Sequence, residues 1–207
     1  MRRAERVQEG LKARHDSLPE SDQAMVDALL ESIPDLEARL RELLPDPGKG
    51  RKIRHHGDFH LGQVLIVKDD VSIIDFEGEP RRSVADRRKK APAARDVAGL
   101  LRSIDYSTTA ALERALKSAP DEHGKIARAL DIWRERSTAT FVDTYRATVA
   151  DHLIWPSNAR RAERVLDFFL LEKAFYEIGY ELAHRPEWLR VPLAGILKIL
   201  TKKREAT

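Results

Sequence analysis

The sequence contains no cysteine among its 207 residues. This absence excludes disulfide bonds and thiolate-bound metal, and it favours a cytoplasmic protein. No stretch approaches the roughly 20 apolar residues that a membrane-spanning helix needs, so no membrane partner is expected. The charged start of the chain, Met1 to Arg6, also lacks the apolar core of a signal peptide.

The chain has little excess charge of either sign, with a net charge of +3 at pH 7. Such a balance permits an anionic ligand such as a nucleotide, and it predicts no nucleic-acid partner. Cationic side chains are dense at one place only, which we call the basic loop (residues 81–92): Arg81, Arg82, Arg87, Arg88, Lys89 and Lys90. A solvated surface loop and a loop that meets phosphate or a neighbouring domain are both open interpretations.

With 42% hydrophobic and 34% charged residues, the chain has the composition of a soluble globular domain or of one large lobe. Apolar residues recur at helical spacing before residue 45 and again from about Ala93. Ser17 to Glu20 has the form of a capping box, Pro34 interrupts the next helical run, and Pro45 to Gly50 reads as a loop.

The central part of the chain predicts a β-hairpin. Two short β-branched runs, 64–67 and 71–74, flank a polar turn. We therefore predict a mostly α fold with a small β-hairpin, built as one lobe. Its parts are a helical lead-in (1–50), a loop, hairpin and acidic segment (51–80), the basic loop (81–92) and a helical subdomain (93–207). In the last part we expect helices near 93–106, 108–119, 121–150, 158–184 and 188–202.

The hairpin brings three polar side chains to one end. If its turn lies near Asp69 and Asp70, Val64 pairs approximately with Asp75, and Gln63 lies beside Asp75. Asp58 is on the loop that enters the same strand. Two carboxylates and an amide suit phosphoryl transfer, which needs a carboxylate to orient the attacking hydroxyl and oxygen ligands for Mg²⁺.

Two simpler interpretations stand beside this one. Aspartates are common at hairpin ends because they favour turns. His55, His56 and His60 could instead bind zinc, although no fourth ligand has recognisable spacing and the oxygen donors suit Mg²⁺ better.

Three motifs carry a family resemblance: HHGDFHLGQVL, IIDFEGEP and RRKKAPAARDVAGLLRSIDY. The chain resembles the aminoglycoside-phosphotransferase-like kinases from about Lys52 to Leu200, with glutamine where most of them have asparagine. Within that group it is most similar to maltokinases, including those fused to trehalose synthase. The resemblance implies the C-terminal lobe of a protein-kinase-like fold. It also implies ATP and Mg²⁺, with maltose converted to maltose 1-phosphate for α-glucan synthesis.

The resemblance also assigns roles to single residues. Asp58 would be the catalytic base, and Gln63 and Asp75 would hold Mg²⁺ on the nucleotide phosphates. His56 would brace the loop backbone, and His60 would support it.

Two further acidic residues have supporting roles in this comparison. Glu77 would face the same side as Asp75 if the strand continues. Asp96 resembles the aspartate that fastens the catalytic loop in such kinases, although an ordinary helix N-cap explains it equally well locally.

The helix expected at 158–184 has two distinct faces. One narrow stripe is assigned to the core: Leu171, Phe175, Ile178 and Leu182. Lys173, Tyr176 and Tyr180 cluster on the opposite side, where aromatic faces and polar groups could bind a sugar. Packing of the tyrosines against another helix is the alternative, and the maltokinase pattern favours the sugar.

No glycine-rich phosphate loop or strand-borne lysine is recognisable in the first fifty residues. We therefore expect an N-lobe, or a trehalose synthase domain, to be a partner, and little kinase activity from the chain alone. Two other functions stay open. One is a non-catalytic sugar-binding or docking module. The other is a phosphotransferase for another acceptor, such as an aminoglycoside or choline.

Overall fold

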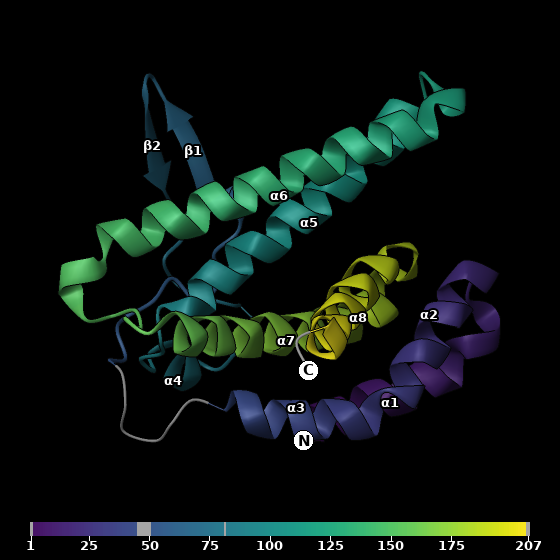
Figure 1. Cartoon of the computed structure of the whole chain (residues 1–207), viewed down its shortest axis with the longest axis horizontal. Helices are drawn as coiled ribbons and strands as arrows, with labels where there is room; N and C mark the ends of the chain where they lie inside the picture. Colours follow the sequence, from purple (N-terminus) through teal and green to yellow (C-terminus); the bar gives the residue numbers. More distant parts are fainter. Residues whose placement is uncertain (1, 45–50, 81, 206–207) are drawn as a thin grey trace. The chain divides into compact units, whose positions relative to one another are not determined.

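The computed structural model describes residues 2–44, 51–80 and 82–205 (Figure 1). These residues are mostly helical and contain one antiparallel two-stranded sheet, formed by β1 (Val64–Val67) and β2 (Asp70–Ile73). The prediction of a mostly α fold with a small β-hairpin is confirmed. The chain divides into two compact units, unit 1 (residues 1–46 and 167–207) and unit 2 (residues 47–166), which are described separately.

Unit 1 is a helical assembly around an aliphatic core. Its helices are α1 (Arg2–Arg14), α2 (Glu20–Glu31), α3 (Ile33–Leu43), the second part of α7 (Ala159–His184) and α8 (Arg190–Glu205), with 3₁₀ turns at His15–Ser17 and Pro186–Trp188. Removal of branched aliphatic side chains from water drives this packing. Fully buried core members include Val26, Leu29, Leu171, Ile178, Leu193 and Ile196.

The start of α2 differs from the sequence prediction. The Ser17 hydroxyl donates back to the carbonyl of Arg14 at 2.7 Å, so it closes a 3₁₀ turn. Helix α2 follows Pro19 without a side-chain cap, and the predicted capping box is wrong. The interruption at Pro34 is confirmed, since α2 ends before α3 begins with this proline in its first turn. The predicted loop at residues 45–50 lies outside the described residues.

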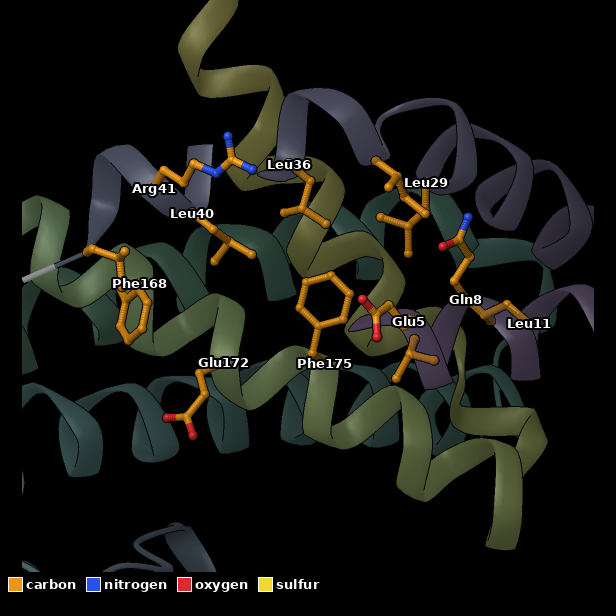
Figure 2. Close-up of a pocket in the computed structure, with 13 residues that line it drawn as sticks. Glu5, Gln8, Leu11, Leu29, Leu36, Leu40, Arg41, Phe168, Glu172 and Phe175 are labelled. Carbon is orange, nitrogen blue, oxygen red and sulfur yellow. The ribbon is translucent and has the colours of Figure 1, made fainter. Parts of the chain in front are cut away.

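An apolar pocket of about 300 Å³, partly open to solvent, lies in unit 1 among α1, α2, α3 and α7 (Figure 2). Leu36 and Leu40 of α3 and Phe175 of α7 point into it. Its lining is mostly aliphatic and aromatic, although Glu5, Arg41 and Glu172 also border it.

Unit 2 contains α4 (Val84–Arg87), α5 (Ala94–Leu116), α6 (His123–Thr148) and the first part of α7. Helices α5 and α6 pack along each other (Figure 1). Three 3₁₀ turns complete unit 2, at Leu61–Gln63, Pro120–Glu122 and Ala150–His152.

The expected break in α5 near residue 107 is absent. Ser107 and Thr108 donate their hydroxyls to the carbonyls of Ser103 and Ile104, each one turn earlier, so the helix continues through them. The two predicted helices at 93–106 and 108–119 are therefore one. The predictions for 121–150, 158–184 and 188–202 agree with α6, α7 and α8 within a few residues.

The basic loop is not wholly irregular. It contains α4, whose first turn is capped by Ser83 through a hydrogen bond from the Asp86 N–H at 3.1 Å. Its end pairs with the strand-like residue Ile53, and the two backbone hydrogen bonds between Ile53 and Ala91 measure 2.9 and 3.1 Å. This bridge joins the two ends of the segment that carries the hairpin.

Among the described helices, we find none whose length and hydropathy suit a bilayer crossing.

Candidate active site

The hairpin register differs by two residues from the predicted one. Val64 pairs with Ile73, and Val67 pairs with Asp70. Lys68 adopts a left-handed conformation with φ of 56°, which places the turn one residue earlier than expected. The predicted pairing of Val64 with Asp75 is therefore wrong.

Gln63 and Asp75 nevertheless meet at the open end of the hairpin. The Gln63 Nε2 donates to Asp75 Oδ2 at 3.0 Å. The backbone N–H of Ile74 donates to the Gln63 carbonyl at 3.0 Å, which extends the ladder by one step. Asp75 then has φ of 64°, so the chain leaves the strand direction at this residue. His60 completes the group, with its Nε2 3.4 Å from Gln63 Nε2.

His56 connects the loop that carries Asp58 to the end of β2. Its Nε2 lies 2.7 Å from the carbonyl oxygen of Ile74, and its Nδ1 lies 3.4 Å from the backbone nitrogen of Asp58. One neutral tautomer, with the proton on Nε2, satisfies both contacts. The imidazole is 5% exposed and packs between the rings of Phe59 and Phe76, with centroids 5.4 and 4.9 Å away. The segments of Asp58 and Asp75 are thus joined through one buried ring.

Asp96 of α5 holds the same loop from its other side. Its Oδ2 accepts from the N–H of His56 at 2.7 Å, and its Oδ1 accepts from the N–H of Gly57 at 2.9 Å. The N-cap residue of α5 is Ala93, and it has no side-chain cap. The N-cap interpretation of Asp96 is therefore wrong, and its carboxylate instead satisfies two consecutive loop amides.

Two further α5 residues at this contact were not identified from the sequence. A Cβ built on Gly99 would lie 2.6 Å from the carbonyl oxygen of Phe59, so only glycine permits this approach. The Ser103 hydroxyl accepts from the N–H of Leu61 at 3.1 Å. Positions 96, 99 and 103 share one helix face at spacings of three and four. That spacing of small and polar residues was the available signal.

Glu77 lies in a turn, because β2 ends at Ile73. Glu77 was predicted to face the same side as Asp75 if the strand continued, but the strand does not continue to this residue. Arg87 of the basic loop contacts it instead: Nη1 donates to the Glu77 carbonyl at 3.2 Å and lies 3.5 Å from Oε2. Arg87 was another residue that the sequence did not single out.

The donor set around the hairpin favours a hard cation over zinc. The described residues contain no group of three or more His, Cys, Asp or Glu side chains placed to hold a metal. His56 and His60 use ring nitrogens in hydrogen bonds within the loop. The adjacent amide and carboxylate of Gln63 and Asp75 are oxygen donors of the kind Mg²⁺ takes, alongside water and phosphate oxygens.

The residues proposed for sugar binding lie on the part of α7 that belongs to unit 1. The core stripe opposite them is confirmed, with Leu171, Phe175, Ile178 and Leu182 all buried. Lys173 Nζ lies 5.1 Å from the ring centroid of Tyr176, and the Arg185 guanidinium carbon lies 5.1 Å from that of Tyr180. Both tyrosine rings thus have a cation over them.

The sequence did not predict that two carboxylates of α7 are buried. Glu177 and Glu181 are buried. Glu181 receives two hydrogen bonds from Arg185, at 3.0 and 2.8 Å. The helix face at residues 173–185 is therefore rich in both carboxylates and cations.

Residues 2–129 match the phosphotransferase enzyme family. The chain belongs to this family. It is 28% identical to the glucosamine kinase of Streptacidiphilus jiangxiensis over 96% of its length, and 32% identical to that of Mycolicibacterium smegmatis over 70%.

Solved structures give the same comparison. A glucosamine kinase in complex with glucosamine, ADP and inorganic phosphate superposes with a TM-score of 0.71 at 27% identity, covering 97% of this chain. A second crystal form of a glucosamine kinase gives 0.69 at 28% identity over 96%. The family-level prediction is confirmed, but these relatives are glucosamine kinases and not maltokinases.

The chain spans less than half the length of these relatives. It covers 42% and 34% of the two curated sequences, and 47% and 45% of the two solved chains. This proportion agrees with the prediction that the fold represents the C-terminal lobe.

Proposed function

We propose that this chain is the C-terminal lobe of an ATP-dependent sugar kinase. The main support is the hydrogen bond from Gln63 Nε2 to Asp75 Oδ2 at 3.0 Å. The His56 ring also connects the Asp58 backbone to the same end of the hairpin. In this proposal Asp58 orients the sugar hydroxyl and accepts its proton as the γ-phosphoryl group is transferred.

Gln63 Oε1 and the Asp75 carboxylate would hold Mg²⁺. When bound, Mg²⁺ neutralises charge on the nucleotide phosphates. The chain's own contribution is to fix the two oxygen donors side by side, with His60 and the backbone of Ile74 limiting the movement of Gln63. His56 and Asp96 are supporting residues in this scheme because they hold the loop backbone, and Glu77 is one because it contacts Arg87.

The acceptor is proposed to be a sugar. Both curated relatives are named glucosamine kinases, which makes glucosamine the first acceptor to test, and the sequence motifs make maltose the second. Lys173, Tyr176 and Tyr180 are the candidate sugar-binding residues on α7.

The nucleotide is proposed to need a covering partner, either an N-lobe or a fused domain. The hairpin supports this proposal because its apolar side chains face solvent: Ile66 is 83% exposed, Val71 61% and Val67 50%. Contiguous exposed apolar surface is typical of an interaction site. A nucleotide base or a second lobe placed on this hairpin would remove that surface from water.

The experiment is an assay of ATP-dependent phosphorylation of glucosamine and maltose, with the 207-residue chain alone and joined to the N-terminal half of a relative. We expect transfer only with the added half and with Mg²⁺. Asp58→Asn should lower kcat by about a thousandfold or more while sugar affinity is kept. Asp69→Asn, in the exposed hairpin turn, is the matched control and should leave transfer unchanged.

Three results would change the proposal. Full turnover by the chain alone would remove the need for a partner. Retained transfer in Asp58→Asn would remove this residue from the mechanism. Calorimetric binding of sugar with no effect of Mg-ATP, in the joined protein as well, would favour a non-catalytic sugar-binding module.

A further inference from the structure

A pocket of about 270 Å³ lies in unit 2 between the Gly57 backbone and the basic loop. None of Asp58, Gln63 and Asp75 lines it. We call it the basic pocket because two carboxylates, Glu79 and Asp86, face five cationic side chains: Arg82, Arg87, Lys89, Lys90 and Arg95.

The lining carries five cationic side chains against two carboxylates, and one of the cations, Arg87, also lies 3.5 Å from the Glu77 carboxylate. Asp86 is already engaged, accepting from Lys89 Nζ at 2.6 Å and from the Ser83 hydroxyl at 2.7 Å. Arg82 and Arg95 lie close enough to His55 to lower its pKa, after burial as the main cause and against the opposite effect of Asp96. His55 is therefore neutral near pH 7 and adds no positive charge to the pocket. An excess of like charge around a small space favours the binding of an anion.

The floor of the pocket is backbone. Gly57 and Gly78 both have left-handed conformations, with φ of 87° and 80°. A Cβ on Gly57 would lie 3.2 Å from the Gly78 Cα and 3.6 Å from His55 Nε2. Side chains at these positions would occupy space that a ligand could otherwise use.

Two polar atoms at this pocket lack hydrogen bonds within the described part of the chain. They are His55 Nδ1 and Arg87 Nε, which are both buried. Leaving a buried polar atom unpaired is unfavourable, and such atoms call for an explanation in a native structure. An acceptor bound in the pocket, with a small movement of the Arg87 side chain, would supply a partner.

We propose that the basic pocket binds a phosphate group, as inorganic phosphate or as the phosphate of a small monoester. A tetrahedral dianion offers several acceptor oxygens to guanidinium and ammonium donors arriving from different directions. The pocket is smaller than typical sites for drug-sized ligands, which are about 300–1,000 Å³, so it suits one phosphate with at most a small group attached. The site is separate from the proposed catalytic residues and does not depend on their function.

The test is calorimetric titration of the intact chain with inorganic phosphate, and separately with glucose 6-phosphate, in EDTA so that no metal recruits phosphate to Asp75. We expect saturable binding that weakens as NaCl is raised. Lys90→Gln and Arg82→Gln should each weaken binding about tenfold, the effect of losing roughly 1.4 kcal/mol. Arg88→Gln, an exposed neighbour outside the pocket, is the matched control and should bind as the wild type does.

A second measurement does not depend on variants. In NMR titrations the pKa of His55 should rise on addition of phosphate, because the anion offsets the field of Arg82 and Arg95. The same ionic strength of NaCl should raise it less. Tighter binding of glucose 6-phosphate than of phosphate would identify a monoester as the ligand, and the reverse would identify the free ion. Absence of saturable binding at millimolar phosphate, or equal binding by wild type and both pocket variants, would overturn the proposal.

Discussion

The Cα of Gly99 faces the carbonyl oxygen of Phe59 so closely that an added Cβ would lie 2.6 Å from it. This distance is well inside van der Waals contact, and the obstructing atom is backbone. Helix α5 therefore approaches the loop that carries Asp58 more closely than a side chain at position 99 would permit. The loop's geometry depends on a missing side chain as much as on the hydrogen bonds of Asp96.

Gly99→Ala is expected to destabilise the chain by about 1–3 kcal/mol, because loop and helix must separate to admit the methyl group. Gly124→Ala, at a helical position with open space around it, is the matched control. That change should be neutral or stabilise by up to about 1 kcal/mol through helix propensity. Urea unfolding measures both, and equal effects of the two changes would refute the close approach.

Asp96→Asn should loosen the loop. The amide keeps one acceptor oxygen where the carboxylate offers two, so one of the His56 and Gly57 N–H groups loses a charge-assisted bond, at a cost of about 1–3 kcal/mol. Amide hydrogen exchange should become faster at these two residues in particular. Asp131→Asn, in an exposed pair with Arg134, should change stability by less than about 0.5 kcal/mol. Unchanged exchange at residues 56 and 57 would contradict the assigned contact.

Much of the arrangement followed from sequence pattern, and the exceptions have physical reasons. The β-branched runs and the polar turn predicted the hairpin, because strand preference is local. The predicted register of the hairpin was wrong because Lys68 adopts a left-handed conformation that non-glycine residues seldom adopt.

Contacts between distant segments were harder to predict. Gly99 and Ser103 contact a loop some forty residues away. Their spacing marks one face of α5, but one sequence does not reveal which loop that face meets. The buried state of Glu177 and Glu181 was likewise unexpected, since charged residues are seldom buried without partners. Arg185, one turn beyond Glu181, was the available signal.

His56→Phe separates packing from hydrogen bonding at the centre of the site. A phenyl ring can keep the contacts with Phe59 and Phe76, but it leaves the Ile74 carbonyl without its donor. We expect a loss of about 1–3 kcal/mol in the free energy of unfolding. The joined, active form of the protein should show a lower kcat with KM nearly unchanged, because Asp58 is no longer tied to the hairpin. A variant that kept both stability and kcat would show that the ring serves only as packing.

The stability of the chain should depend on pH through His55. Its pKa lies below the ordinary value of 6.5, mainly because of burial, so the unfolded state binds more protons than the folded state in mildly acidic solution. The free energy of unfolding should therefore fall as the pH is lowered through 6.5. In His55→Gln this part of the pH dependence should be absent. Urea unfolding at a series of pH values from about 8 to about 5 compares the two proteins, and identical slopes would contradict the assignment.

The backbone bridge between Ile53 and Ala91 has a kinetic consequence. It closes a long loop that contains Asp58, the hairpin and most residues of the basic pocket, whereas α5 forms from contacts close in sequence. Closing a loop costs entropy before its contacts repay it, so we expect the helix to be present in the folding transition state and the loop to join afterwards. Weakening the site should then accelerate unfolding and leave the folding rate almost unchanged.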